Sequence, residues 1–195
     1  EKEKMELEKF IKVFDDTMPP KIIGSCVKYF NTLDFAQQSV IGKNGKSVTK
    51  TNTRNALGWY FPSKPMTDVH WSNLWLCTFR KLYMDYRKFY NIYTDICCNE
   101  IKTIGALKYE PGGFYVPHSD MHNNYPRTLS FIYFLNNDYE GGELVFHTPD
   151  RHCDETVIIK PAPGRCVIWP SNFMYPHSVK SVKKGTRYVL VSWMA

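Results

Sequence analysis

Four residues of this sequence have the types and spacing to carry chemistry together: His118, Asp120, His177 and Arg187. His118 and Asp120 lie two positions apart in the stretch YVPHSDMHNN. On an extended strand, side chains at i and i+2 point to the same face, so an imidazole nitrogen and a carboxylate oxygen can reach one metal ion. An HxD pair alone is a weak pattern, because such pairs more often mark only surface polarity.

His177, in the stretch MYPHSVKSV, is the candidate for a third ligand. A β-sandwich could return this segment beside His118 and Asp120. Two histidines and one carboxylate on one face of a metal, with other positions open, are typical of non-haem Fe(II) oxygenases. Arg187 follows inside an apolar run, where an uncompensated charge would be costly and a guanidinium could hold a carboxylate in a bidentate fork. A bound dicarboxylate would supply that partner.

The secondary-structure elements that must position these residues are predicted to be mainly helical in the first half of the chain and strands in the second. Residues 1–10 form a charged helical or frayed lead-in, and Pro19-Pro20 open an amphipathic helix that extends to about residue 33. Asn44-Gly45 predicts the turn of a lysine-rich hairpin. Between residues 68 and 96, apolar side chains recur every three or four positions, which predicts one long helix or two in series.

After Cys98 the sequence turns to short β-like runs bounded by turn residues. They are IKTIGALKY, RTLSFIYFL, GELVFHT, ETVIIK, RCVIWP and TRYVLVSWM. Short strands without intervening helical patterns predict an antiparallel sandwich or jelly roll. The predicted fold class is therefore α+β, with a double-stranded β-helix (jelly-roll) core and N-terminal helices packed on one sheet, in a single domain over residues 1–195.

Composition narrows the class of protein. A chain of 195 residues that is 43% hydrophobic can bury a core, and its net charge of +6 tolerates an acidic or nucleic-acid partner without requiring one. Its six cysteines show no CxxC spacing, which indicates free thiols in a reducing compartment. Without a long apolar run or a signal-peptide pattern, we expect a soluble, cytoplasmic protein with no membrane partner.

Four stretches make residues 101–195 resemble the 2-oxoglutarate- and Fe(II)-dependent dioxygenases, specifically their prolyl 4-hydroxylase-like branch. They are YEPGGFYVPHSD, RTLSFIYFLNNDYEGGELVF, PAPGRCVIWPSN and YPHSVKSVKKGTRYVLVSW. The resemblance implies that residues 101–195 form the catalytic jelly-roll core, while residues 1–100 give helical support and a substrate loop. It further implies Fe(II), 2-oxoglutarate and O2 as cofactors, with ascorbate.

The resemblance assigns roles to five residues around the cofactors. His118, Asp120 and His177 would be the iron ligands. Arg187 would hold the distal carboxylate of 2-oxoglutarate, and Tyr109 would help to hold the same co-substrate.

Two positions depart from the family pattern. The family often has a tyrosine before Leu-Asn or a threonine after Gly-Gly-Glu, and either residue gives a hydroxyl to the co-substrate carboxylate. Phe134 and Leu144 occupy these places here. We therefore expect Tyr109 to supply more of the polar shell, or 2-oxoglutarate to bind less tightly.

The implied function is hydroxylation of a C–H bond, with peptidyl proline favoured and succinate and CO2 released. Tyr115, Arg127 and Trp193 match residues that line the proline pocket in the family, and the hairpin at residues 43–54 is a candidate lid. The partner would be a peptide or protein, with proline in it.

Two alternatives remain open. One is a related oxygenase acting on another side chain, a free amino acid or a nucleobase. Nucleic-acid demethylases of the superfamily usually carry a second arginine where this chain has Trp193, which counts against a nucleic-acid substrate. The other is a non-catalytic jelly-roll binding module, which the presence of all three ligands disfavours. The remaining histidines fit no ligand spacing and are expected on the surface or in loops: His70, His122, His147 and His152.

Overall fold

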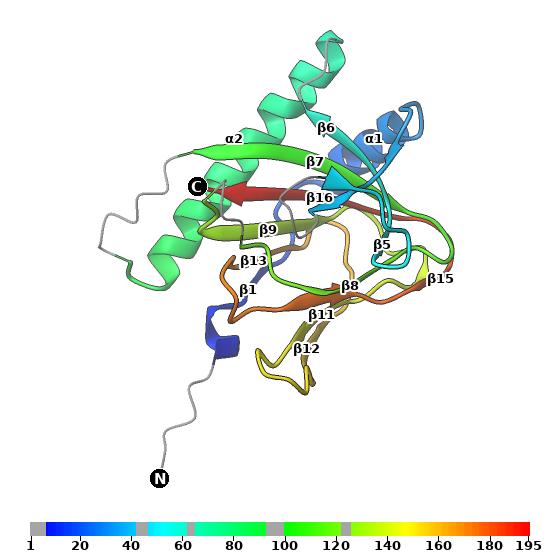
Figure 1. Cartoon of the computed structure of the whole chain (residues 1–195). Helices are drawn as coiled ribbons and strands as arrows, with labels where there is room; N and C mark the ends of the chain where they lie inside the picture. The colour runs from blue at the N-terminus through cyan, green and yellow to red at the C-terminus, as the bar shows by residue number, and fades with distance from the viewer. Residues whose placement is uncertain (1–6, 42–46, 62–64, 93–99, 122–125) are drawn as a thin grey trace.

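The computed structural model describes residues 7–41, 47–61, 65–92, 100–121 and 126–195 (Figure 1). Two antiparallel sheets form its core. The larger has the strand order β1-β13-β9-β16-β7-β6-β2 and the smaller the order β12-β11-β14-β8-β5. Figure 1 shows α2 running along the outer side of the larger sheet. Two facing antiparallel sheets agree with the predicted jelly-roll class.

The larger sheet contains β1 (Lys12–Phe14), β2 (Ala36–Gln37), β6 (Leu57–Phe61), β7 (Ile101–Tyr109), β9 (Leu129–Phe134), β13 (Cys166–Pro170) and β16 (Arg187–Met194). The smaller sheet contains β5 (Arg54–Asn55), β8 (Phe114–His118), β11 (Leu144–His147), β12 (Glu155–Ile159) and β14 (His177–Val179). Two short pairs are β3 (Val40–Ile41) with β4 (Ser47–Val48), and β10 (Glu140–Gly141) with β15 (Val182–Lys184). The helical elements are η1 (Leu7–Phe10), α1 (Pro20–Phe30) and α2 (Met66–Phe89).

The larger sheet is buried on both faces. In β9, Phe131 and Tyr133 belong to the apolar cluster shared with the helices, whereas Ile132 and Phe134 belong to the cluster between the sheets. Because successive strand residues point to opposite faces, β9 can be apolar at nearly every position without losing its register. The same alternation in β16 turns Val189 toward the interior between the sheets and Leu190 toward the helices. Arg187, two positions before Val189, therefore shares the interior face.

The long helix α2 packs through one apolar stripe. Trp71, Trp75 and Phe79 are spaced four residues apart and are buried. The ring of Trp75 meets that of Tyr133 on β9 edge-on, with centroids 4.8 Å apart. Aromatic pairs in this geometry add to the free energy gained by burying their area, so the stripe is core.

Besides the predicted helices and hairpin, the first half of the chain adds strands to both sheets. β6 pairs with β7 along its full length, and β1 pairs with β13 at the opposite edge. β5 pairs with β8 in the smaller sheet. Strands of two or three residues are too short to show an alternation of apolar and polar side chains, so their formation depends on tertiary pairing.

Three local predictions can be compared directly with the structure. The hairpin is present as β3 paired with β4, and its Asn44-Gly45 turn lies outside the described residues. α2 ends at Phe89, earlier than predicted, and residues 93–96 are likewise not described. The cysteines that the structure describes are free thiols, as expected: Cys26, Cys77, Cys153 and Cys166. Within the described ranges, no helix has both the length and the apolar character needed to cross a membrane.

Candidate metal centre

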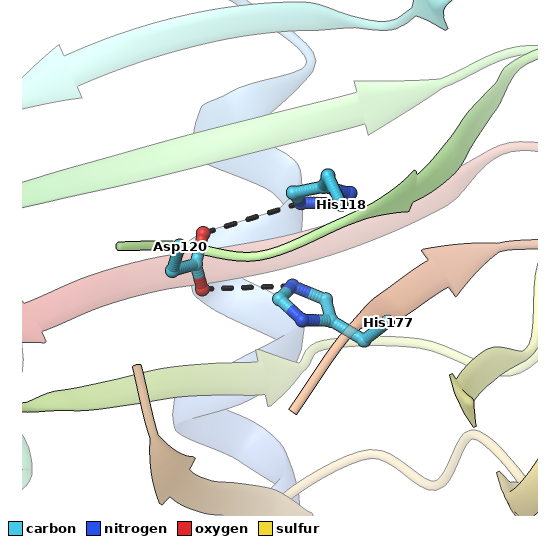
Figure 2. A group of neighbouring side chains, drawn as sticks. All are labelled: His118, Asp120 and His177. Atoms are coloured by element: carbon cyan, nitrogen blue, oxygen red, sulfur yellow. Dashed lines mark ion pairs between the residues drawn. The ribbon is translucent and has the colours of Figure 1, made fainter. Parts of the chain in front are cut away.

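The smaller sheet places His118 and His177 opposite each other on neighbouring strands. They are direct register partners at the ends of β8 and β14, and their ring centroids lie 4.3 Å apart. Asp120 follows just after β8 ends, and its carboxylate points between the two imidazoles (Figure 2). One possible ligand atom from each residue lies within 4.8 Å of the others. The predicted trio therefore forms a cluster that could hold a metal ion.

Backbone carbonyls orient both imidazoles toward this cluster. Nδ1 of His118 lies 2.9 Å from the carbonyl oxygen of Val116, and Nδ1 of His177 lies 3.1 Å from that of Tyr175. A carbonyl can only accept, so each Nδ1 donates its proton and each Nε2 keeps a lone pair. Nε2 of His177 lies 3.5 Å from Asp120 Oδ2, and Nε2 of His118 lies 4.0 Å from Oδ1. Both Nε2 atoms therefore have the free lone pair that a metal ligand requires.

The surroundings of the cluster favour a neutral His118 beside an ionised Asp120. Burial and the neighbouring His177 lower the pKa of His118 to about 3, although Asp120 acts in the opposite direction. Burial alone would raise the pKa of Asp120. The two imidazoles, the Ser130 hydroxyl and Arg127 outweigh it, so the pKa of Asp120 lies below its usual value. These are the protonation states that a divalent cation requires of its ligands.

A buried hydroxyl pair holds the Asp120 carboxylate from behind. Ser130 Oγ donates to Asp120 Oδ2 at 2.7 Å and lies 2.7 Å from Ser171 Oγ. Both serines are 1% exposed. No local pattern in the sequence marks this pair, since serines within strands carry no distinctive signal.

Replacing Ser130 with alanine should weaken divalent-metal binding by roughly 10–100-fold, the usual effect of losing a group that orients a ligand. Isothermal titration of the protein with Mn(II) measures this directly. Ser192→Ala is the matched control, because Ser192 is also buried but bonds the Thr103 carbonyl on the helix-facing side of the larger sheet. Equal affinities for wild type and Ser130→Ala would show that Ser130 does not orient the carboxylate.

Arg187 is fully buried at 0% exposure. Within the part of the chain that the structure describes, its Nε, Nη1 and Nη2 have no hydrogen-bond partner. The guanidinium carbon lies 4.8 Å from the ring centroid of Tyr109, its cross-strand neighbour, and 5.4 Å from that of Phe134. Ring faces offset only part of the cost of burying a charge. A guanidinium with three unused nitrogens therefore fits an anionic ligand such as the distal carboxylate of 2-oxoglutarate.

Gly142 leaves the space that Arg187 occupies. Its φ is +67°, and a Cβ at this position would come within 2.9 Å of Arg187 Cδ and 3.2 Å of the Tyr139 ring. Glycine adopts a positive φ at little cost and adds no side chain to the contact. The Gly-Gly motif thus permits close packing around the arginine.

Tyr139 brings a hydroxyl that the sequence analysis missed. Burial raises the pKa of Tyr139, while the charge of nearby Arg187 opposes the rise. The two side chains lie close but do not reach hydrogen-bond geometry, and the Tyr139 hydroxyl has no partner among the described residues. It can therefore stand in for the hydroxyl that Phe134 and Leu144 lack.

We expect Tyr139→Phe to weaken 2-oxoglutarate binding by about tenfold, the effect of removing one hydrogen bond to a charged group. The dissociation constant, measured with Mn(II) in place of iron, reports binding without turnover. Tyr188→Phe is the control, because that hydroxyl bonds Asn31 on the helix side. An unchanged affinity for the Tyr139 variant would leave Tyr109 as the hydroxyl to examine next.

A cavity of about 430 Å³ opens in front of the cluster, within the range of small-ligand sites. Its lining includes all three residues predicted for the substrate pocket: Tyr115, Arg127 and Trp193. Tyr115 stacks on His118 with centroids 3.5 Å apart, and the Arg127 guanidinium lies 3.9 Å from the Trp193 ring centroid. Tyr109 also lines the cavity, which connects it to the neighbourhood of Arg187.

One expectation about the other histidines was wrong. His147 lies in β11, is 8% exposed, and has both ring nitrogens in hydrogen bonds, to Ser178 Oγ and the Cys153 carbonyl. It is a satisfied core histidine rather than a surface one. His70 and His152 are exposed as expected, and His122 lies outside the described residues.

Residues 104–195 match the family model described as the 2OG-Fe(II) oxygenase superfamily. A PKHD-type hydroxylase of Crocosphaera subtropica is 36% identical over 101 residues, which are 48% of this chain and 43% of that protein. Human prolyl 3-hydroxylase 2 is 39% identical over 67 residues, 34% of this chain and 9% of that protein. This chain thus spans less than half the length of these curated relatives.

Solved structures share the fold at low sequence identity. The crystal structure of a Pseudomonas putida prolyl-4-hydroxylase superposes with a TM-score of 0.71 and 16% identity, covering 95% of this chain and 92% of that one. A Trichoplax adhaerens prolyl hydroxylase, in complex with a hypoxia inducible factor peptide fragment, gives a TM-score of 0.70 at 15% identity, with 95% and 83% covered. At this identity the likeness establishes the double-stranded β-helix fold and nothing finer.

Proposed function

We propose that this chain, whose residues 104–195 belong to the 2OG-Fe(II) oxygenase superfamily, is an Fe(II)- and 2-oxoglutarate-dependent dioxygenase that hydroxylates proline in a peptide or protein. One observation carries the proposal. The metal cluster and the buried Arg187, which has no hydrogen-bond partner among the described residues, lie within the same two-sheet interior. The cluster consists of His118, Asp120 and His177. A metal ion and a dicarboxylate satisfy both features together.

Each residue near the cofactors has a distinct task in this proposal. His118, Asp120 and His177 hold Fe(II) from one side and leave the other positions open. Arg187 takes the distal carboxylate of 2-oxoglutarate in a bidentate fork, and Tyr109 and Tyr139 stand beside it. When bound, Fe(II) with 2-oxoglutarate and O2 supplies hydroxylation of a C–H bond, coupled to release of succinate and CO2.

In this proposal the protein also orients the substrate. Tyr115, stacked on His118, and Trp193 give the cavity aromatic walls that suit an apolar ring such as proline. The proline hydroxylases among the relatives and structural neighbours support this choice of substrate. They include both 3- and 4-hydroxylases, so the assay must report which ring carbon reacts.

The first test is succinate release from 2-oxoglutarate with Fe(II) and ascorbate, with and without a panel of proline-containing peptides. We expect at least one peptide to stimulate release and to gain the mass of one oxygen atom on proline, with the carbon assigned by NMR. His118→Ala should abolish the stimulation. Iron-dependent release that no proline peptide stimulates would exclude a prolyl substrate, and neither release nor 2-oxoglutarate binding would favour a non-catalytic module.

A further inference from the structure

The cavity in front of the metal cluster is cationic. Two arginines line it, Arg54 and Arg127, and Asp120 is the only carboxylate among its described lining residues. With Asp120 bound to a cation, the described lining residues hold no other carboxylate to offset these two guanidiniums.

Several buried side-chain donors of the cavity lack a hydrogen-bond partner among the described residues. Among its described lining residues, Arg54 Nε, Trp169 Nε1 and Trp193 Nε1 are buried without a hydrogen-bond partner. A buried N–H without an acceptor is costly, and a ligand that supplies the acceptor removes the cost. The cavity thus favours a ligand that brings oxygen acceptors, and beside two arginines an anionic one.

Arg54 lies one aromatic ring away from the metal cluster. It is the register partner of Tyr115, and its guanidinium carbon lies 4.8 Å from the centroid of that ring, which in turn stacks on His118. Its Nη1 makes a long bond, 3.4 Å, to the Ser39 carbonyl. Arg127 makes a similarly long bond, 3.3 Å, to the carbonyl of Asp120, but it also lies 3.9 Å from the Asp120 carboxylate and stacks on Trp193. Arg54 therefore has more unused bonding capacity.

Resting on the proposed function, we propose that Arg54 binds a carboxylate of the peptide substrate, one or two residues from the hydroxylated proline. An extended chain advances about 3.3–3.6 Å per residue, so a neighbouring residue of a proline held at the cluster reaches across the Tyr115 ring. A planar guanidinium matches a carboxylate in two parallel hydrogen bonds. The carboxylate can come from an Asp or Glu side chain or from the peptide's C-terminus.

Three peptides that the wild-type enzyme hydroxylates test this inference. The first has Glu beside the proline and an amidated C-terminus, the second replaces that Glu with Gln, and the third keeps Gln but ends in a free carboxylate. We expect kcat/KM for a carboxylate-bearing peptide to exceed that for the neutral one by about tenfold or more, and the gap to shrink as salt is added. Preference for the first or the third peptide identifies the source of the carboxylate.

Arg54→Gln should remove this preference, because it should lower kcat/KM for the carboxylate-bearing peptide far more than for the neutral one. Arg54→Glu should reverse it, so that a peptide with Lys beside the proline becomes favoured. The control is Arg80→Gln, which removes the same charge from an exposed position on α2. If Arg54→Gln slows all three peptides equally, Arg54 only fastens β5 to Tyr115 and the inference is overturned.

A binding measurement separates this inference from the proposed function. Fluorescence anisotropy of labelled peptides, with Mn(II) and 2-oxoglutarate bound, reads the role of Arg54 without turnover. Equal affinities of the wild type for acidic and neutral peptides would overturn the Arg54 assignment even if hydroxylation proceeds. An Arg54-dependent preference for the acidic peptide without any hydroxylation would support the assignment and overturn the prolyl hydroxylase instead.

Discussion

Replacing Arg187 with methionine is expected to abolish 2-oxoglutarate binding and, at the same time, to make the ligand-free protein more stable. In the wild type, a guanidinium is fully buried with no hydrogen-bond partner among the described residues. Exchanging buried charged groups for apolar side chains of similar volume is often neutral or stabilising by about 1–4 kcal/mol. We therefore expect Arg187 to serve co-substrate binding at the expense of stability.

The two effects can be read in one thermal-unfolding experiment, with Mn(II) present and 2-oxoglutarate added or omitted. Without 2-oxoglutarate, Arg187→Met should melt at a higher temperature than the wild type. With saturating 2-oxoglutarate the order should reverse, because a ligand stabilises only the folded protein that binds it. The expected result is therefore that adding 2-oxoglutarate reverses the order of the two melting temperatures.

Arg165→Met is the matched control for a lost arginine. Arg165 bonds Asp15 in a partly exposed ion pair, with Nε 2.7 Å from Oδ1, and is not among the residues that line the cavity. Such pairs contribute about 0–1 kcal/mol, so this variant should lose little stability and should still respond to 2-oxoglutarate. A ligand-free Arg187→Met that melts well below the wild type would mean that the arginine is stabilised in the fold. A variant that still responds to 2-oxoglutarate would remove Arg187 from the co-substrate site.

Asp120→Asn should reduce Fe(II) or Mn(II) affinity by more than about 100-fold and abolish peptide hydroxylation. The substitution keeps the shape of the side chain and an oxygen that can accept from Ser130, but it removes the only carboxylate in the cluster. Loss of a group that merely orients a ligand costs roughly 10–100-fold, and a charged ligand in a partly buried site contributes more.

Anaerobic titration with Fe(II), or calorimetry with Mn(II), measures this loss of affinity. Asp154→Asn removes an equal charge from an exposed loop and should bind metal as the wild type does. The far-ultraviolet circular dichroism of both variants should match that of the wild type, which would separate metal loss from unfolding. Metal binding by Asp120→Asn at wild-type affinity would move the third ligand to another residue.

The sequence predicts much of the fold, namely the segments that are long enough to show a helical or strand periodicity of apolar residues. α2 was predicted from apolar residues spaced three and four apart, and β7, β9, β13 and β16 from short apolar runs between turn residues. Each of these segments buries a face or two faces, so its own sequence records its surroundings. The edge strands β1, β2 and β5 were not readable, since two or three residues show no period.

For the candidate site, too, some features could be predicted from the sequence and others could not. Residue types and spacing in the sequence determined which groups could act: His118 with Asp120, the distant His177, and an arginine within an apolar strand. The tertiary structure alone decided that β8 and β14 pair in the register that sets the two histidines opposite each other. It also decided that Ser130, Tyr139 and Arg54 join them. Cross-strand register and edge pairing join residues far apart in the chain, and no local pattern of side chains records them.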